Sequence, residues 1–399
     1  MKRNKSLLLM LISLLITGCG GHKITPIPFS IDSKTIDGVS QTPFNEKIEG
    51  TLYLSNDEAI VKDDIEDKIW ELHKLFDNKH EYEGIVNLCS LNNRFEEEIV
   101  VSDTLFYAIK DAIKISKLSQ GIFNFTMGGV YDMWNQVLES CGDESSLLYK
   151  EDQFTDSDID NVLLYSPFYL DLDDFILMNE NDKTIQLVKN HNGKYKLDFE
   201  QIKRGLALDL LTDYSSSFKN NTRINVGYTS QEVYGDSNNE KWEYVLENPS
   251  FEQFKDRRLF SLEFDDNMRM SVSTDAYKHY VVRKNDSLMV RSDVLDGKIG
   301  KANNYYRQVA LFSKDCPNSV LDALSSIIFN IGTNNEVKEM IKTFELEYKC
   351  SIDFVLSRPY TSNDINSFDI SISKNLNQYV RESSKIDKIK SWNVIDNNE

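Results

Sequence analysis

The segment NSVLDALSSI, residues 318–327, places a carboxylate and a hydroxyl four residues apart, at Asp322 and Ser326. On a helix, residues with this spacing lie on one face, so both side chains could contact a single object. Both side chains offer oxygen atoms, which are ligands of the kind that a hard cation such as Mg²⁺ accepts. The spacing alone leaves the identity of the object open. Taken alone, the same spacing more often marks a solvated face or a serine bonded back to its own helix.

Apolar periodicity predicts the elements that position this pair. The stripe of Val320, Leu324 and Ile328 predicts a helix over residues 318–331, which Gly332 could terminate. The same reasoning predicts helices over residues 57–76, 103–121 (with an N-cap at Ser102 and Asp103) and 201–218, strands over 51–55, 222–226, 259–264, 306–313 and 352–356, and short strands with turns between 165 and 198. This pattern is typical of an α+β fold with mixed sheets and packed helices, not of a regular doubly wound sheet.

The chain begins with MKRNKSLLLMLISLLITGC, which reads as a lipoprotein signal peptide over residues 1–18. A basic start precedes an apolar run over residues 7–16, which is too short to span a bilayer, and small residues precede Cys19. We expect Cys19 to carry a lipid; the alternative is an uncleaved anchor. The protein is then expected in the cell envelope, lipid-anchored to a bacterial membrane and facing the periplasm or the exterior.

The charge of the chain limits its partners. Removing residues 1–18 deletes three basic residues and no acidic ones, so the formal charge falls from −19 to −22. A protein with this negative charge is not expected to bind nucleic acid. Its lipid anchor is also expected to be its only attachment to an anionic membrane.

Proline content and cysteine spacing bound the domain organisation. Residues 19–45 hold three of the seven prolines and no apolar periodicity, so we expect a tether there, one compact domain over 46–375 and a C-terminal tail over 376–399.

The remaining cysteines are Cys89, Cys141, Cys316 and Cys350. They permit one or two disulfides whose pairing stays open, and their spacing is not that of a zinc site.

A series of motifs resembles one family in the right order. The best match is GIFNFTMGGVYDMW at 121–134, and KLDFEQIKRGLALD at 196–209 follows it along the chain. Further matches are IEGTLYL at 48–54, LCSLNN at 88–93, INVGYTSQEVYG at 224–235, SVSTDAYKHY at 271–280, DVLDGKIG at 293–300 and LDALSSI at 321–327. Together they resemble the FAD:protein FMN transferases, the ApbE-like flavin transferases, from about residue 46 to residue 375.

The resemblance implies an ApbE-like fold and a reaction. Such an enzyme uses Mg²⁺ to transfer FMN from FAD to a threonine or serine of an acceptor flavoprotein, typically a flavin-carrying subunit of a membrane redox complex, and releases AMP. The resemblance also implies roles for single residues. It assigns FAD binding to Gly50, Tyr82, Ile122, Phe123, Asn124, Asp198 and Arg204, metal binding to Gln201, Asp322 and Ser326, and catalysis to Asp293 and Asp296.

The departures from the family pattern that bear most on cofactor binding and catalysis lie at three positions. Glu200 and Gln201 replace two glycines that let the backbone approach the cofactor, and Asp293 replaces a histidine that is a candidate general base. These changes keep two alternatives open beside the transferase. One is a degenerate relative that binds a flavin nucleotide or a partner without transfer, and the other is a Mg²⁺-dependent FAD hydrolase.

Overall fold

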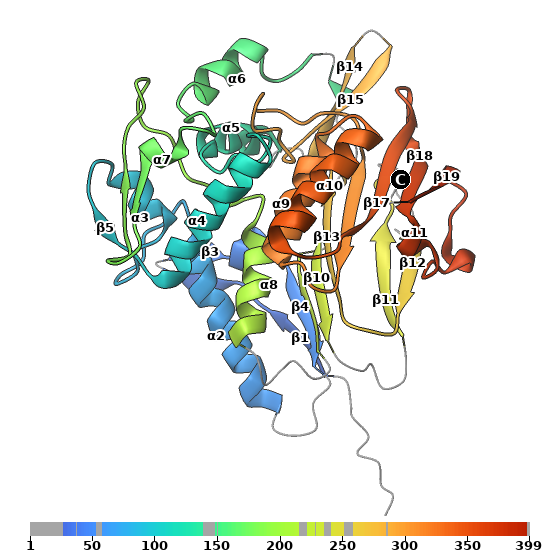
Figure 1. Cartoon of the computed structure of the whole chain (residues 1–399), viewed down its shortest axis with the longest axis horizontal. Coiled ribbons are helices and arrows are strands. Elements are labelled where there is room, and N and C mark those ends of the chain that lie inside the picture. The colour runs from blue at the N-terminus through green and yellow to red at the C-terminus, as the bar shows by residue number, and fades with distance from the viewer. Residues whose placement is uncertain are drawn as a thin grey trace, which may run out of the picture.

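A nine-stranded sheet forms the centre of the computed structural model (Figure 1). The model describes residues 27–36, 38–52, 58–138, 148–149, 151–214, 222–227, 229–234, 241–250, 258–284 and 286–396. In spatial order the strands are β1 (Ile27–Ile31), β4 (Ile48–Leu52), β9 (Thr222–Val226), β10 (Ser230–Tyr234), β13 (Met268–Thr274), β16 (Gln308–Ser313), β17 (Asp353–Thr361), β18 (Asp364–Ser373) and β19 (Ile389–Ile395). Neighbouring strands are antiparallel except β18 and β19.

Helices cover one face of this sheet and a hairpin covers the other. Figure 1 shows α2, α8, α9 and α10 along one face. The helices are α2 (Glu58–Phe76), α3 (Leu88–Asn93), α4 (Asp103–Leu118), α5 (Gly128–Leu138), α6 (Asp156–Leu163), α7 (Leu172–Phe175), α8 (Lys203–Tyr214), α9 (Asn318–Phe329), α10 (Asn334–Tyr348) and α11 (Lys374–Asn377), with short 3-10 turns η1 (Pro43–Asn45) and η3 (Glu382–Ser384). The hairpin pairs β11 (Trp242–Glu247) with β12 (Arg258–Phe264).

Smaller sheets complete the fold. They pair β2 (Lys34–Ile36) with β3 (Val39–Gln41), β5 (Ile99–Val100) and β7 (Ile176–Asn179) with β8 (Thr184–Leu187), and β6 (Leu148–Tyr149) and β15 (Ser287–Ser292) with β14 (His279–Lys284). The α+β fold class predicted from the sequence is therefore confirmed.

The central strands are buried on both faces because layers pack on each side. In β16, Val309 and Leu311 belong to the core beneath the helices, whereas Ala310 and Phe312 belong to the core beneath the hairpin. Successive side chains of a strand point to opposite faces, so a strand between two layers reads as a continuous apolar run. This explains why residues 306–313 were recognisable as a strand.

The predicted helices are present with small shifts at their ends. The expected helices 57–76, 103–121, 201–218 and 318–331 correspond to α2, α4, α8 and α9. Ser102 caps α4 as predicted, since its side chain accepts a hydrogen bond from the Leu105 amide. Gly332 does not terminate α9: the helix ends at Phe329, with Asn330 as its C-cap.

The predicted tether is wrong for residues 27–45. In β1, Phe29 and Ile31 are buried, and the strand pairs with β4 from Ile27 opposite Leu52. The prolines suggested a linker, but β1 is an edge strand of the sheet. Proline has no N–H to donate, and an edge strand tolerates this because one of its sides pairs with no other strand.

The predicted C-terminal tail is also wrong, because β19 adds a parallel strand to β18. Trp392 of β19 packs edge-on against Phe260 of β12, with ring centroids 5.1 Å apart. The domain therefore extends to residue 396. The signal peptide and Cys19 lie outside the described residues, and none of the helices among the described residues combines the length and apolarity that a membrane crossing needs.

No disulfide joins the cysteines of the described residues. Cys89, Cys316 and Cys350 are buried and free, and Cys141 lies outside the described residues. A hydrogen bond with Cys350, together with burial, raises the pKa of the Cys316 thiol. Cys316 and Cys350 are therefore neighbouring thiols, and the disulfide pairing that the sequence left open stays a prediction.

Candidate active site

Two helices, α8 and α9, cross so closely that only a glycine fits between them. A Cβ on Gly205 would lie 2.3 Å from the Asn318 carbonyl oxygen. Asp209, one turn further along α8, accepts hydrogen bonds from the Asn318 and Ser319 amides at 2.7 and 2.9 Å. These amides belong to the first turn of α9, where backbone donors lack helical partners. The motif at 196–209 thus fixes α9, and with it Asp322 and Ser326, against α8.

Asp322 is fully buried and takes its partners from three elements. Its carboxylate accepts hydrogen bonds from the Gly205 amide at 3.1 Å and from the hydroxyls of Ser271 and Ser230 at 3.1 and 3.4 Å. Arg204 Nε lies 3.8 Å away. Burial raises the pKa of Asp322, although Arg204 opposes this effect. The carboxylate is therefore held by protein groups, with an amide and two hydroxyls as donors and a guanidinium beside it.

The predicted pairing of Asp322 and Ser326 on one helix face is correct. The Ser326 hydroxyl lies 3.1 Å from that of Ser273, just as Asp322 meets Ser271. Four residues of helix rise about 6 Å, and two residues of strand rise about 6.6 Å. The α9 pair and the β13 pair therefore match in spacing, which explains how a polar ladder fits inside a packed helix-sheet interface.

Arg204 connects Asp322 to a second carboxylate. Its Nη1 donates to Glu46 Oε1 at 3.0 Å. Burial opposes the charge, but the carboxylates of Asp322 and Glu46 raise the pKa of Arg204, so it stays cationic. Glu46 reaches this position because Gly227 has a positive φ of 64° and a Cβ there would lie 2.8 Å from Glu46 Oε2.

A cavity of about 240 Å³ opens beside this ion pair. Acidic, basic and hydroxyl side chains meet in its wall. It is lined by Glu46, Glu200, Gln201, Arg204, Thr229, Val272, Ser273, Thr274, Tyr277, Lys278, Asp293, Val294 and Ser326. A neighbouring cavity of about 290 Å³ shares Glu200 and Lys278 with it, and is further lined by Phe44, His73, Phe76, Asp77, Asn78, Lys79, Asn135, Asp198, Phe199 and Lys203.

Asp293 faces the first cavity with a basic partner. Its Oδ2 lies 3.8 Å from Lys278 Nζ. Burial raises the pKa of Asp293, with Lys278 acting in the opposite direction. A carboxylate with a raised pKa is a stronger base than a solvated one, which suits proton transfer near neutral pH.

Family and structural comparisons identify the arrangement. The family model described as ApbE matches residues 42–350. The chain belongs to the ApbE family. No curated protein matches the chain significantly.

Solved ApbE structures share the fold. The ApbE protein from Thermotoga maritima aligns with a TM-score of 0.66 at 15% identity, covering 90% of this chain and 100% of that one. The flavin transferase ApbE from Vibrio cholerae gives 0.62 at 15%, covering 89% and 100%. The apo form of flavinyl transferase ApbE from Pseudomonas stutzeri gives 0.61 at 15%, covering 89% and 96%. The predicted ApbE-like fold is therefore confirmed.

Gln201 offers the clearest vacant ligand atom among the metal-binding residues implied by the ApbE resemblance. Its Nε2 donates to the Leu295 carbonyl at 2.8 Å, whereas the buried Oε1 has no hydrogen-bond partner. Thr229 Oγ1, in the same cavity wall, also has none. Amide and hydroxyl oxygens are of the kind that Mg²⁺ prefers. Within the described residues no cluster of three histidine, cysteine or acidic side chains could hold a metal, so these neutral oxygens and Ser326 are what fits the ion.

Asp198 lies on the second cavity rather than the first. It accepts hydrogen bonds from the Asn78 side chain at 2.6 Å and from the Glu200 amide at 2.8 Å. Burial, reinforced by the charge of Glu200, raises the pKa of Asp198 to about 6. Tyr82 is near the same cavity through Asp77, to which its hydroxyl donates at 2.7 Å.

Other residues implied by the resemblance hold the fold. Gly50 is a close-packing position, since a Cβ there would lie 2.4 Å from the Phe29 ring. Phe123 is buried and stacks on Phe125. Asp296 does not line either cavity beside α8: its carboxylate accepts hydrogen bonds from the Lys298 amide and the Asn303 side chain at 2.9 and 3.0 Å. In this structure Asp296 stabilises a turn, and the catalytic role that the resemblance implies for it stays a prediction.

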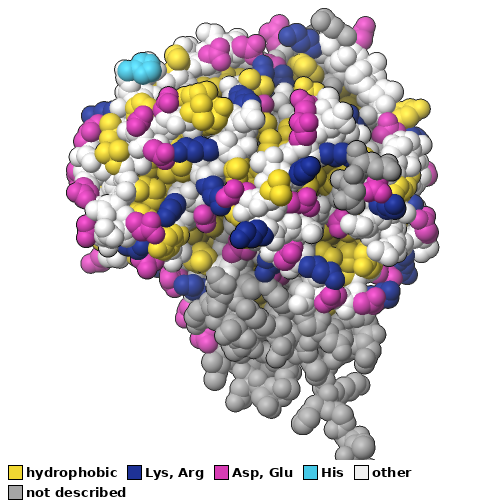
Figure 2. All heavy atoms as spheres, viewed as in Figure 1, with side chains coloured by type: hydrophobic (Ala, Val, Ile, Leu, Met, Phe, Trp, Pro, Cys, Tyr) yellow, Lys and Arg dark blue, Asp and Glu magenta, His cyan; other side chains and the backbone are white. Residues whose placement is uncertain are grey.

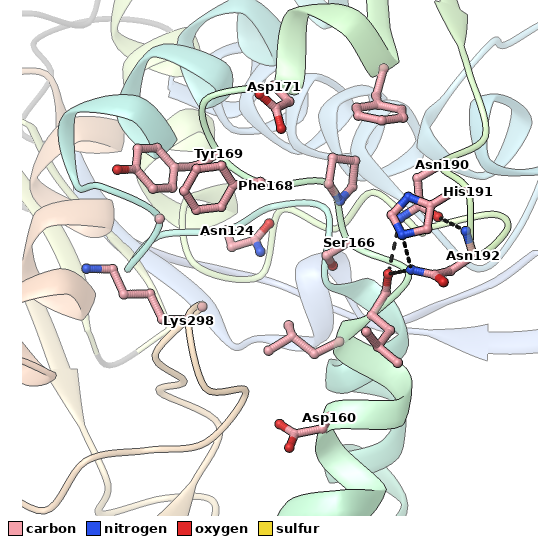
Figure 3. Close-up of a pocket in the computed structure, with 16 residues that line it drawn as sticks. Asn124, Asp160, Ser166, Phe168, Tyr169, Asp171, Asn190, His191, Asn192 and Lys298 are labelled. Carbon is pink, nitrogen blue, oxygen red and sulfur yellow. Dashed lines mark hydrogen bonds between the residues drawn. The ribbon is translucent and has the colours of Figure 1, made fainter.

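Asn124 lines a third and larger cavity, of about 660 Å³ (Figure 3). The Ile122 carbonyl accepts a 2.7 Å hydrogen bond from the Gly297 amide, and Asn124 and Gly297 both line this cavity. Asn124 Oδ1 accepts hydrogen bonds from the amide and hydroxyl of Thr126 at 3.0 and 2.7 Å. Asn124 therefore shapes the loop at this cavity instead of meeting Asp322 or Asp293.

Lys278 and Glu46 are the site residues that sequence reasoning missed. Lys278 lies inside the matched segment SVSTDAYKHY at a position to which the resemblance assigned no role, and Glu46 lies at the predicted edge of the domain. The visible face of the molecule shows acidic and basic side chains interspersed (Figure 2), so charge alone would not have selected them. Only the pairing of distant segments brings them to the cavity.

Proposed function

We propose that this protein is a flavin transferase that moves FMN from FAD to a hydroxyl of an acceptor protein and releases AMP. The observation that carries the proposal is the cavity beside α8 and α9 of an ApbE-family chain. There Asp293, a carboxylate with a raised pKa, lies across from the cation Arg204 and beside Lys278. A phosphoryl transfer needs a base near the nucleophile and positive charge around the phosphates.

The proposed transfer forms one P–O bond and breaks another. The acceptor oxygen forms a bond to the FMN-side phosphorus as the bond from that phosphorus to the AMP oxygen breaks. Asp293 accepts the hydroxyl proton, and AMP leaves with the electron pair of the broken bond. Lys278 and Arg204, which line the cavity, would face the charge of the phosphates. The buried location strengthens these interactions, because water screens them less there.

Mg²⁺ is part of the proposal as the family's metal. Gln201 Oε1 and Ser326 Oγ would hold the ion, and Asp322 would join them on release from Arg204. When bound, the ion would neutralise phosphate charge and stabilise the AMP leaving group. The acidic residues of the cavity make this neutralisation useful, since Glu46, Glu200 and Asp293 outnumber Arg204 and Lys278 in its wall.

The acceptor is proposed to be a flavin-carrying subunit of a membrane redox complex. A lipid on Cys19 would hold the enzyme at the membrane in the cell envelope, where such subunits present their threonine or serine. Because the chain is acidic, we expect the contact surface of the acceptor to be neutral or basic.

One observation favours a second candidate, a degenerate relative that binds without transfer. Asp322 already forms an ion pair with Arg204, and Lys203 already forms one with Glu200. The carboxylate that would bind the metal and a lysine that would bind the diphosphate are therefore both paired within the protein. An FAD hydrolase differs from the transferase only in accepting water as the nucleophile.

One incubation separates these functions. The purified protein is mixed with FAD and Mg²⁺, with and without a flavin-carrying acceptor subunit, and AMP and protein-bound FMN are measured. A transferase yields both products only with the acceptor, and chelation of the metal stops the reaction. AMP without acceptor would identify a hydrolase, and FAD binding without AMP would identify the degenerate relative. Absence of any flavin binding would refute all three.

A further inference from the structure

The two cavities beside α8 share a wall that Glu200 helps to form. Glu200 and Lys278 line both cavities, whereas Lys203 lines only the second and Arg204 only the first. Each cavity alone is smaller than the roughly 300–1,000 Å³ typical of small-molecule pockets, and the two together fall within that range. Glu200 and Lys278 therefore lie where the two cavities meet, and the two cavities together have the size of a ligand-binding cleft.

The Glu200 carboxylate also occupies an anion position. Its Oε2 accepts a 2.6 Å hydrogen bond from Lys203 Nζ, and the two side chains are only 17% and 11% exposed. Lys203 is one of three cations near this carboxylate, and Lys278 and Arg204 line the walls of the same cavities. A phosphate entering the cleft would compete with this carboxylate for the same cations.

We propose that Glu200 is a carboxylate plug that determines the ligand specificity of this cleft: a dinucleotide diphosphate such as FAD binds only when its phosphates displace Glu200 from Lys203 and join the two cavities. This inference rests on the proposed function, because it concerns how FAD enters the same site. It makes Glu200 a specificity-determining residue and not a catalytic one. It also gives the negative charge at this position a physical role, since the carboxylate satisfies Lys203 while no phosphate is bound.

Binding measurements on the whole protein with two probes, FAD and inorganic pyrophosphate, test the plug at fixed Mg²⁺. E200G and E200A remove both the bulk and the charge, so each should bind FAD at least about tenfold more tightly than wild type, a gain of about 1.4 kcal/mol. E200Q keeps the bulk but releases Lys203, so its affinity should lie between those of wild type and E200G. It also tests the proposal if E200G does not fold. The matched control is E382Q, which removes a carboxylate with the same i,i+3 lysine pairing on the exposed surface, Glu382 with Lys385 at 2.9 Å.

The outcomes separate the plug from the flavin function. Tighter FAD binding by the Glu200 variants, with E382Q unchanged, supports the plug. Equal FAD affinity in wild type and E200A would overturn it while leaving the flavin function intact. An equal gain in E382Q would also overturn it, because net charge alone would then explain the effect. Tighter pyrophosphate binding by the Glu200 variants, with no FAD binding by any of the proteins, would support the plug and refute the flavin function.

Discussion

The Arg204 guanidinium lies 3.8 Å from the Asp322 carboxylate and joins the first turn of α8 to the middle of α9. Because Asp322 is fully buried and Arg204 is only 15% exposed, neither charge has much water to replace its partner. Breaking such a pair on one side leaves an uncompensated buried charge. The pair therefore holds the helix junction that forms the cavity wall.

Asp322→Ala should lower the free energy of unfolding by roughly 3–5 kcal/mol, because the buried Gly205 amide and Ser271 hydroxyl lose their acceptor and Arg204 keeps only Glu46 as its ionic partner. Chemical denaturation measures the change. Asp266→Ala is the matched control, because Asp266 pairs with Lys314 at 2.7 Å on the exposed surface and should cost at most about 1 kcal/mol. Equal losses in the two variants would contradict the structural role of the Arg204–Asp322 pair.

Metal binding is better tested at Ser326 and Gln201, which line the cavity without holding the helix junction. Ser326→Thr keeps the hydroxyl and restores the family residue, so Mg²⁺-dependent FAD binding should change little. Ser326→Ala and Gln201→Ala each remove a proposed oxygen ligand and should weaken the apparent Mg²⁺ affinity several-fold. Titration of Mg²⁺ at constant FAD measures this. If neither alanine variant shifts the Mg²⁺ midpoint, the ion does not bind through these oxygens.

Sequence could predict the pairing of Asp322 and Ser326 on one helix face because it depends only on local periodicity. It could not predict that Asp322 meets Arg204 and Ser271, since these contacts join segments far apart in the chain. The resemblance identified the α8 motif, whereas the structure gave its physical meaning: Gly205 admits α9 and Asp209 caps it. Asp296 shows the opposite case, where a matched residue proves to hold a turn.

The ends of the domain escaped prediction for a different reason. Strand β1 carries proline and lies at a sheet edge, and β19 pairs in parallel with β18 after a connection that contains α11 and η3. Neither strand has a long two-residue alternation or a tight turn to its neighbour. Their stability comes from sheet pairing and from contacts such as Trp392 on Phe260, which a local pattern does not encode.

The carboxyl of Asp198 should give the protein a measurable pH dependence. Its pKa rises from 3.8 to about 6 on folding, so between these values the folded protein holds a proton that the unfolded chain has released. Stability should therefore fall as pH rises from about 4 to about 6, by roughly 1–3 kcal/mol for this group. Asp198→Asn should remove that part of the slope in urea unfolding. Asp209 and Asp275, whose pKa values are also raised to about 6, should leave a residual slope. An unchanged slope in the variant would contradict the raised pKa of Asp198.

Cys19→Ala should abolish lipidation and release the protein from the membrane or stall its precursor, because Cys19 is the expected acceptor of the lipid. Fractionation of cells with mass spectrometry of the N-terminus measures both outcomes. Cys89→Ala is a matched control, since Cys89 is buried within the domain and should leave fractionation unchanged. Normal processing and membrane retention of the Cys19 variant would refute the lipoprotein prediction.

Asp293 tests the proposed base most directly. Asp293→Asn keeps the size of the side chain and removes its ability to accept a proton, so transfer of FMN should fall by about 100-fold or more while FAD affinity changes little. Asp293→His places the family residue beside Lys278 and should retain transfer, with a pH profile whose acidic limb follows an imidazole instead of a carboxyl group. Steady-state rates of AMP release between pH 5 and 9 distinguish the two variants. A shifted acidic limb with retained transfer is the signature of a base at this position. If Asp293→Asn transfers FMN as fast as wild type, another group accepts the proton, and the pairing of Asp293 with Lys278 at 3.8 Å serves only to hold the cavity wall.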